Sequence, residues 1–487
     1  MKKSKIFFVS AEVYPFVKAG RGAEFAGSLP PYLQALGHEV RVLMPKYSLI
    51  NERKHIIRDI IRLKDIPVQM FNGSTTVSVK SGFIPETKTQ IYFADSEKYY
   101  KRADMYRDIR TNLFFKDNDE RFIFLAKVAI ETLKTLGWQP DIVHCCDWPT
   151  GLLPAMIRDE QKKNNFFKKT IVTFSINEIG EAGLFDKSVY EKTGISEERV
   201  DKEKCWYKNK LSFLKSGTAF ADAVTVPYIH KHLKSIGKPA NDFESILAPC
   251  KTIYDVPFAG DHNLWNPASN NTLYKSYSSE KYERKQTNKE GFLADKRTGF
   301  SDTQLTIGIL AEDIDHQQKS ITQFLKLLKD YPLQFFIIGN QNPASVAGIK
   351  SAISKNDKHK IFTYHDPDDQ FRHNFFAVCD LFYIPPTDHF SELYYLNGIH
   401  YGAVPLMHKD NHVADLFDSI KEKTLNGNAF IFGDDKDLIR KVDTALEFFK
   451  EKDKWDVLVK RVMKTDLSWN KFTAPFIKIY ERALSKI

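Results

Sequence analysis

The sequence contains no apolar run of about twenty residues, which excludes a helix that spans a membrane. It has only five cysteines, an odd number without the spacing of a disulfide framework. The neighbouring pair Cys145 and Cys146 does not provide the paired spacing of a zinc site. Internal repeats and low-complexity segments are also absent. We therefore expect a cytoplasmic protein with reduced thiols, no bound metal and no cofactor.

A concentrated block of positive charge is missing as well. The formal net charge of +9 comes from 71 basic and 62 acidic residues spread along the chain, which does not indicate nucleic-acid binding. Two interpretations of the basic excess stay open, a cationic cleft for a phosphorylated ligand and a solvated lysine-rich surface. The basic and apolar start of the chain is interrupted by Glu12, and no small-residue cleavage site follows, so we interpret it as a first strand.

What the sequence does contain is enough apolar material for two cores: 487 residues, of which 42% are hydrophobic. Short continuous apolar segments, typical of buried strands, alternate with longer helical patterns such as 24–37 and 120–137. The strand patterns of the first half lie at 5–11, 39–45, 141–147, 170–176 and 223–227. This alternation predicts an α/β fold with an open parallel sheet covered on both faces.

A cluster of Pro, Gly and Asn at 247–271 interrupts the rhythm, and a second domain follows. Its predicted strands lie at 305–311, 333–339, 360–365, 380–386, 403–408 and 429–433. The lysine-rich stretch 278–300 precedes them, and we expect it on the surface. The prediction is two Rossmann-like, doubly wound domains, 1–252 and 253–465, which face an interdomain cleft where a ligand binds.

Six segments carry a resemblance that covers nearly the whole chain. They are 5–47, 117–155, 261–270, 402–408, 428–432 and 463–484. In order and spacing they resemble the bacterial glycogen synthases and plant starch synthases of glycosyltransferase family 5. The resemblance implies the GT-B fold, with a helix at 466–487 that returns to the first domain. It also implies retaining transfer of glucose from ADP-glucose to an α-1,4-glucan, a reaction that needs cations and backbone amides around the leaving diphosphate.

The loop after the first strand keeps part of the family's Lys-Thr-Gly-Gly motif. Lys18, the expected diphosphate contact, and Gly20 are retained, and the acidic position survives as Glu24, a candidate for sugar binding. The second glycine is Arg21, whose side chain crowds the donor unless its guanidinium takes over the phosphate contact. Both a phosphate-binding and a solvated Arg21 stay open.

The next two motifs of the first domain are also altered. Asp147 and Trp148 remain from a His-Asp-Trp motif, either as sugar contacts or as a helix-capping carboxylate beside a packed indole. The flanking histidines are replaced by Cys146 and Pro149. Asn177 stands where the family has a histidine that contacts the transferred sugar, and an amide cannot reproduce the charge behaviour of an imidazole.

The second domain departs further at its phosphate positions. Glu312 and Gln317 occupy the places of an arginine and a lysine that contact the diphosphate, and His389 occupies that of the catalytic glutamate. Losing one such preorganised group costs about 3 kcal/mol in the transition state. Lys319 could substitute only in a rebuilt loop.

Further replacements lie nearby. A carboxylate, Glu392, stands where a glycine leaves a helix N-terminus open to an anion, and Asn411 and His412 replace paired glycines. Phe258 replaces the asparagine of the interdomain segment, while Trp265 survives as an expected structural residue.

The matched positions build cores and turns, and the mismatches fall on groups that bind charge or sugar. We therefore expect a family member with little or no transferase activity, so that its status as an enzyme is uncertain, and with a role in binding glucan, in regulation, or as partner of an active synthase or of itself. One alternative is an active transferase with a rearranged donor site that uses Lys18, Arg21, Asp147 and His389. The other is a binding module for a different small ligand, favoured by aromatic and histidine replacements at Phe390, Tyr394, Tyr395, His389, His400 and His412.

Overall fold

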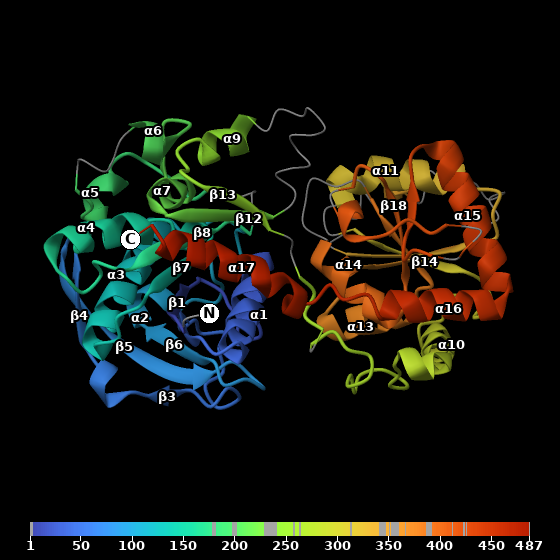
Figure 1. Ribbon diagram of the computed structural model, residues 1–487, viewed down its shortest axis with the longest axis horizontal. Helices are drawn as coiled ribbons and strands as arrows, with labels where there is room; N and C mark the ends of the chain where they lie inside the picture. The colour runs from blue at the N-terminus through green and yellow to red at the C-terminus, as the bar shows by residue number, and fades with distance from the viewer. Residues whose placement is uncertain are drawn as a thin grey trace. The chain divides into compact units, whose positions relative to one another are not determined.

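The chain divides into two compact units, shown in the computed structural model of Figure 1. Unit 1 comprises Met1–Pro257 and Phe472–Ile487, and unit 2 comprises Phe258–Lys471. The structure describes residues 3–177, 182–196, 202–227, 241–256, 259–262, 264–311, 314–339, 347–349, 351, 360–365, 367–385, 392–411, 413–421, 424 and 426–486. The domain limits predicted after residues 252 and 465 stay predictions, because a compact unit need not be one that folds alone.

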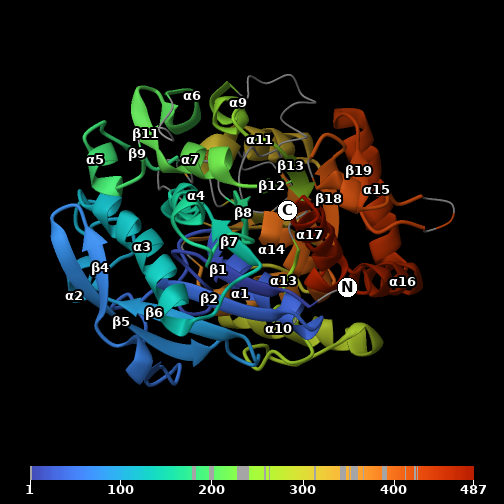
Figure 2. The same cartoon turned by 60° about the vertical axis from the view of Figure 1, so that its left-hand side comes forward.

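The main sheet of unit 1 has the strand order β13-β12-β8-β7-β1-β2-β6-β5-β3, with β4 paired to β5. Neighbours from β13 to β6 are parallel, whereas β5, β3 and β4 are added antiparallel. Figure 2 shows β4 and β5 in blue at the outer edge of the unit. The strands are β1 (Lys5–Val9), β2 (Glu39–Pro45), β3 (Arg58–Asp59), β4 (Ile66–Met70), β5 (Gly73–Phe83), β6 (Gln90–Asp95), β7 (Ile142–Cys146), β8 (Ile171–Ser175), β12 (Ala223–Pro227) and β13 (Ile253–Val256).

Helices cover the sheet of unit 1, and a small second sheet lies beside it. The helices are α1 (Arg21–Ala35), α2 (Glu97–Tyr100), α3 (Asn118–Leu136), α4 (Leu153–Lys163), α5 (Val189–Thr193), α6 (Lys202–Cys205), α7 (Phe213–Phe220), α9 (Asn241–Leu247) and α17 (Trp469–Leu484). The small sheet has the order β10-β11-β9, formed by Trp206–Tyr207, Lys210–Ser212 and Leu184–Phe185.

The described residues of unit 2 form a parallel sheet with the order β16-β15-β14-β17-β18-β19. Its strands are β14 (Thr306–Leu310), β15 (Gln334–Gly339), β16 (Lys360–His365), β17 (Leu381–Ile384), β18 (Val404–His408) and β19 (Phe430–Phe432). Its helices are α10 (Lys285–Asp295), α11 (Ile314–Leu327), α13 (Asp369–Val378), α14 (Glu392–Gly398), α15 (Asp435–Lys450) and α16 (Lys452–Met463). Numbered within the sheet, this is the doubly wound order 3-2-1-4-5-6.

The central strands confirm the prediction of an α/β fold with buried parallel sheets. Every residue of β7, β8, β14, β15 and β17 is buried, and parallel strands covered on both faces need such continuous apolar sequences. In the part of the chain that the structure describes, no helix is both long and apolar enough to cross a membrane.

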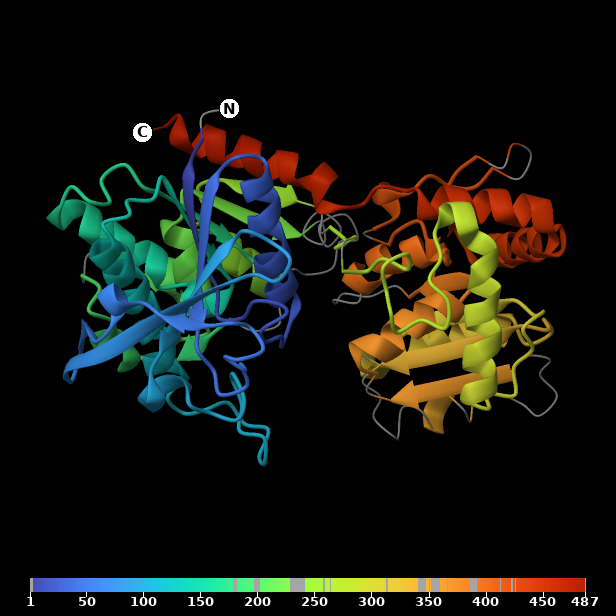
Figure 3. The same ribbon diagram turned by 90° about the horizontal axis from the view of Figure 1, so that it is seen from below.

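The lysine-rich stretch 278–300 is mostly exposed or half-buried, as predicted, but one face of it is buried. It contains the whole of α10, and two of its lysines, Lys285 and Lys289, are buried. The ammonium of Lys285 donates hydrogen bonds to three backbone carbonyls, and that of Lys289 pairs with Asp380 at 2.7 Å. Burial is possible because each amine gains several acceptors in place of water. Figure 3 shows α10 in yellow-green on unit 2.

The last helix, α17, packs against unit 1. The hydroxyl oxygen of Tyr480 lies 2.6 Å from Nδ1 of His144 in β7, and the rings of Phe476 and Phe25 are 5.6 Å apart. Figure 3 shows the helix in red along unit 1. The final residues of the chain therefore complete the core that its first residues begin.

Candidate functional site

The predicted site residues of unit 1 follow strands β1, β7 and β8. These strands are parallel and β1, β7 and β8 are successive neighbours, so their carboxyl ends meet at one edge of the sheet. The loop 10–20 follows β1, Asp147 follows β7, and Asn177 comes two residues after β8. The topology thus brings together residues that are far apart in the sequence.

Glu12 anchors the loop after β1 and was missed as a site residue. Its carboxylate accepts hydrogen bonds from the backbone N–H groups of Ala19 and Gly20, the latter at 2.9 Å, and from the Tyr106 hydroxyl at 3.3 Å. The side chain is buried, so a charge is held inside the protein by amide donors. The available signal was a carboxylate that interrupts an apolar segment directly after a strand.

Lys18 and Glu24, two predicted ligand contacts, form an ion pair with one another. The side chain of Glu24 is almost completely buried, and that of Lys18 is partly exposed. The ammonium of Lys18 therefore already has a counter-ion, which reduces the positive charge that it offers to a phosphate.

Arg21 is the first residue of α1, and its side chain turns into the protein. Only 5% of it is exposed, and its guanidinium Nη2 donates a hydrogen bond of 2.9 Å to the backbone carbonyl of Asn177. The solvated Arg21 considered from the sequence is wrong, since the side chain is buried. Two positions that the resemblance predicts to be altered are thus in direct contact with each other.

Asp147 is held by Asn177. The backbone N–H and the side-chain Nδ2 of Asn177 donate to the two carboxylate oxygens of Asp147, at 2.6 and 2.9 Å. Asp147 has a φ of 59°, a left-handed conformation that is uncommon for residues with a side chain. Its carboxylate makes no capping bond to the short helix that follows, Trp148–Thr150, so the helix-capping interpretation is wrong.

Gly22 is a second residue that sequence reasoning missed. A Cβ atom at this position would lie 2.5 Å from a carboxylate oxygen of Asp147. The first turn of α1 can therefore approach Asp147 only because residue 22 has no side chain. No motif in the sequence marks this requirement.

Trp148 is a packed indole. It is 8% exposed, its ring meets that of Phe122 edge to face at 4.8 Å, and a Cβ on Gly183 would lie 2.5 Å from it. Of the two interpretations of Trp148, the structure supports the packed one, because little of the ring is left for a sugar.

In unit 2, Gln317 lies in α11 and is 2% exposed. Neither atom of its amide forms a hydrogen bond with a residue that the structure describes. Lys319, two residues further on, is exposed. Glu312, His389, Phe390, His412 and Phe258 lie outside the described residues, as does the side chain of Glu392.

The remaining predicted residues of unit 2 are structural. Asn411 is buried and bonds two backbone groups, the carbonyl of Pro385 at 3.2 Å and the N–H of Val413 at 3.1 Å. Trp265 is 1% exposed and packs against His373, with ring centroids 4.2 Å apart, as expected of a structural residue.

The aromatic and histidine replacements that suggested a different ligand are buried or half-buried where they are described. Tyr394 and Tyr395 are both buried, and Tyr395 donates a hydrogen bond to the carbonyl of Leu310. Burial also lowers the pKa of His400 to about 4, so its imidazole is neutral at pH 7. Among the described residues, no three side chains of His, Cys, Asp or Glu come together as metal ligands.

Comparison with known proteins identifies relatives along the whole chain. Residues 5–229 match the starch synthase catalytic domain family. The chain is 29% identical to the glycogen synthase of Chlorobaculum parvum and 27% identical to that of Thermosipho africanus, over 99% of this chain and 99% of each relative.

The fold also matches a solved structure. The catalytic domain of starch synthase IV from Arabidopsis thaliana, bound to ADP and acarbose, superimposes with a TM-score of 0.81. The match has 20% sequence identity and covers 99% of this chain and 100% of that chain, which confirms the GT-B fold. The chain is thus similar from end to end to the glycogen and starch synthases, and these matches support glycosyltransferase family 5 as its family.

Proposed function

We propose that this protein acts in α-1,4-glucan metabolism without ordinary glucosyl transfer from ADP-glucose. In this proposal it is a cytoplasmic family member with little or no catalytic activity, and it binds glucan or regulates an active synthase. The proposal combines the family assignment with the geometry of the residues that differ from the family motifs.

The observation that carries the proposal is the bonding of Arg21, Asn177 and Asp147 to one another. The guanidinium of Arg21 bonds the carbonyl of Asn177 at 2.9 Å, and the amide of Asn177 bonds Asp147. A group that stabilises a leaving diphosphate has to direct its hydrogen-bond donors at the ligand. Arg21 is 5% exposed, which supports an internal structural role for its side chain.

The other phosphate positions support the same conclusion. Lys18 is paired with Glu24, and Gln317 supplies a buried neutral amide where the resemblance implies a lysine. An uncharged group cannot neutralise a diphosphate as it leaves. Losing one such preorganised donor costs about 3 kcal/mol, or two to three decades in rate, and several are affected here.

The test is incorporation of labelled glucose from ADP-glucose into glycogen, with the Chlorobaculum parvum synthase as the active reference. Calorimetric titrations with ADP and with maltoheptaose accompany the assay. We expect transfer at least about a thousandfold slower than the reference, consistent with the loss of one or more transition-state donors. We also expect no heat of ADP binding at millimolar concentration and measurable binding of maltoheptaose.

Transfer within tenfold of the reference would contradict the proposal and favour the active enzyme with a rearranged donor site. A matched pair of variants then tests whether Arg21 binds the phosphate of the donor. Replacing a phosphate-binding arginine (Arg21→Gly) would abolish that transfer, whereas replacing the exposed Arg110 (Arg110→Gly) would leave it unchanged. Absence of both transfer and glucan binding would instead favour a module for a different small ligand.

A further inference from the structure

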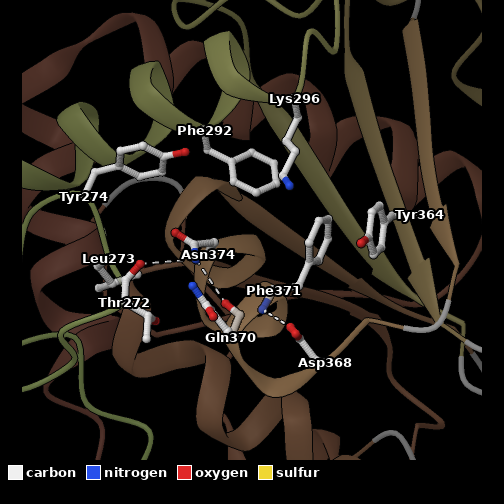
Figure 4. A pocket seen from close by; sticks show the side chains of 10 residues that line it. All are labelled: Thr272, Leu273, Tyr274, Phe292, Lys296, Tyr364, Asp368, Gln370, Phe371 and Asn374. Atoms are coloured by element: carbon white, nitrogen blue, oxygen red, sulfur yellow. Dashed lines mark hydrogen bonds between the residues drawn. The ribbon is translucent and has the colours of Figure 1, made fainter.

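A pocket of about 430 Å³ lies within unit 2, between α10, the end of β16, the start of α13 and the segment 272–274. This volume lies in the range of pockets that bind small ligands. Figure 4 shows its lining in two groups, with Tyr274, Phe292 and Lys296 on one side and Gln370, Phe371 and Asn374 on the other. The pocket contains none of the residues that the resemblance places in the transfer site.

Aromatic rings form much of the wall. Phe371 stacks on Tyr364 with centroids 3.7 Å apart, and the edge of Phe292 meets Phe371 at 5.5 Å. Phe292 and Phe371 are buried, so their rings are fixed by packing. The pocket thus has a rigid aromatic base rather than a set of mobile side chains.

Tyr274 is an aromatic surface at the mouth of this pocket. A Cβ on Gly291 would lie 2.6 Å from its ring, so one part of the ring rests directly on the backbone of α10. Its hydroxyl is bonded to Asp295. Although it is held at both ends, 43% of the residue is exposed. A large exposed ring with little rotational freedom is suited to stacking on a ligand, since binding then costs little conformational entropy.

The polar groups of the pocket include an acceptor without a donor. The side chain of Asn374 is 8% exposed, and its Nδ2 donates to the carbonyl of Gln370 at 3.0 Å. Its Oδ1 is buried and accepts no hydrogen bond from any residue that the structure describes. An unpaired buried carbonyl is costly, and a ligand hydroxyl at this wall would remove the cost.

The charges at the pocket favour a neutral ligand. Lys296 places its ammonium 5.5 Å from the centroid of Phe371, while Asp368, at the opposite side, accepts a hydrogen bond from the N–H of Phe371. One cation and one carboxylate leave no excess charge for a phosphate. Rings for stacking, together with separate amide, hydroxyl and carboxylate groups for hydrogen bonds, match a sugar, which has an apolar face and hydroxyls around its edge.

We infer that this pocket binds a neutral pyranose unit of an α-glucan chain, with one sugar face on the ring of Tyr274 and hydroxyls toward Gln370 and Asn374. The inference goes beyond the proposed function, because the pocket is built from unit 2 alone and would bind glucan whether or not the protein transfers glucose.

The test is hydrogen exchange of the full chain in the presence of maltotetraose at several millimolar, with cellotetraose and adenosine as comparison ligands. We expect maltotetraose to slow exchange in residues 270–276 and 367–376. The variant Tyr274→Ala, which removes the stacking ring, should need an about tenfold higher maltotetraose concentration for the same protection. A change of about tenfold in affinity corresponds to the free energy of one stacking contact. Gln370→Ala provides a second variant, at an exposed position where folding is not at risk.

The matched control is Tyr331→Ala. Tyr331 is also a partly exposed tyrosine of unit 2 whose hydroxyl bonds an aspartate, Asp443 at 2.9 Å, but it lies outside the pocket. Its replacement should leave the protection intact. Three outcomes would overturn the inference: no protection of these segments by maltotetraose, protection by adenosine in its place, or the same protection in wild type and Tyr274→Ala. None of them depends on the glucose-transfer assay.

Discussion

At the scale of single residues, the site shows how one position determines what its neighbours can do. Asp147 is in a left-handed conformation and is fixed by two hydrogen bonds from Asn177. A carboxylate held in this way cannot move aside at low cost, so the position opposite to it must be small. That position is Gly22, in the first turn of α1.

We therefore predict that Gly22→Ala destabilises the protein. Alanine in a helix normally gains about 1 kcal/mol over glycine, but the new methyl group would lie 2.5 Å from the Asp147 carboxylate. Overpacking costs about 1–3 kcal/mol, so we expect a net loss of up to about 2 kcal/mol. Chemical denaturation measures the difference. Gly433→Ala is the control, since its nearest neighbour is at 3.8 Å, and a Gly22→Ala variant as stable as wild type would contradict the argument.

The contacts within the site join residues that are far apart in the sequence, so the sequence alone could not predict them. The bond from Arg21 to Asn177 joins positions 156 residues apart, and that from Asn177 to Asp147 joins positions 30 apart. The resemblance identified Arg21 and Asn177 as altered and Asp147 as retained, but it contains no information about long-range partners. The direction in which Arg21 points therefore became known only from the structure.

At the scale of elements, the central strands β7, β8, β14, β15 and β17, which are buried throughout, were predictable. The five strand patterns of the first half correspond to β1, β2, β7, β8 and β12, and the six of the second half to β14–β19. The predictions omitted β3, β4, β5, β6, β9, β10, β11 and β13. Of these, β5 is mostly exposed or half-buried, and such a strand lacks the continuous apolar pattern on which the prediction relied.

The buried Lys285 of helix α10 joins this helix to two other parts of unit 2. The amine of Lys285 donates to the carbonyls of Phe376 and Ala377, at the end of α13, and of Tyr401. Replacing it with an apolar residue (Lys285→Met) leaves these acceptors without that donor, and we expect a loss of about 2–4 kcal/mol. Urea denaturation at pH 7 measures the loss, with the exposed Lys281→Met as control.

The pH dependence of this difference provides a second check. Burial lowers the pKa of Lys285 to about 8, below that of an unfolded lysine near 10.5. Between these values the unfolded state binds more protons, so the wild type becomes more stable relative to Lys285→Met as pH rises from 8 to 10.5. A constant difference over this interval would show that the amine is not desolvated.

At the scale of the whole molecule, neutral histidines that are buried or half-buried in both units contribute to the response to acid. Burial lowers the pKa of His144 and His262 to about 3 and of His373 and His400 to about 4. An unfolded histidine titrates near 6.5. Between pH 6.5 and 4 the unfolded state therefore binds protons that the folded state does not.

We predict that the free energy of unfolding falls steadily as pH decreases from 6.5 to 4. Urea denaturation at intervals of half a pH unit measures the slope, and His400→Gln should reduce it, because one fewer buried imidazole then titrates on unfolding. The exposed His365→Gln is the control and should keep the wild-type slope. Stability that is constant across this range would contradict the prediction.

Unit 1 is discontinuous in the sequence, since the segment Phe472–Ile487 joins it only after the whole of unit 2. On the ribosome, all of unit 2 is made before Tyr480 and Phe476 exist, so the hydrogen bond to His144 and the contact with Phe25 are formed last. Release of the nascent chain directly before this segment would yield a complete second unit and a first unit with an uncovered core. Complete translation is thus a condition for closing the hydrophobic core with which the polypeptide began.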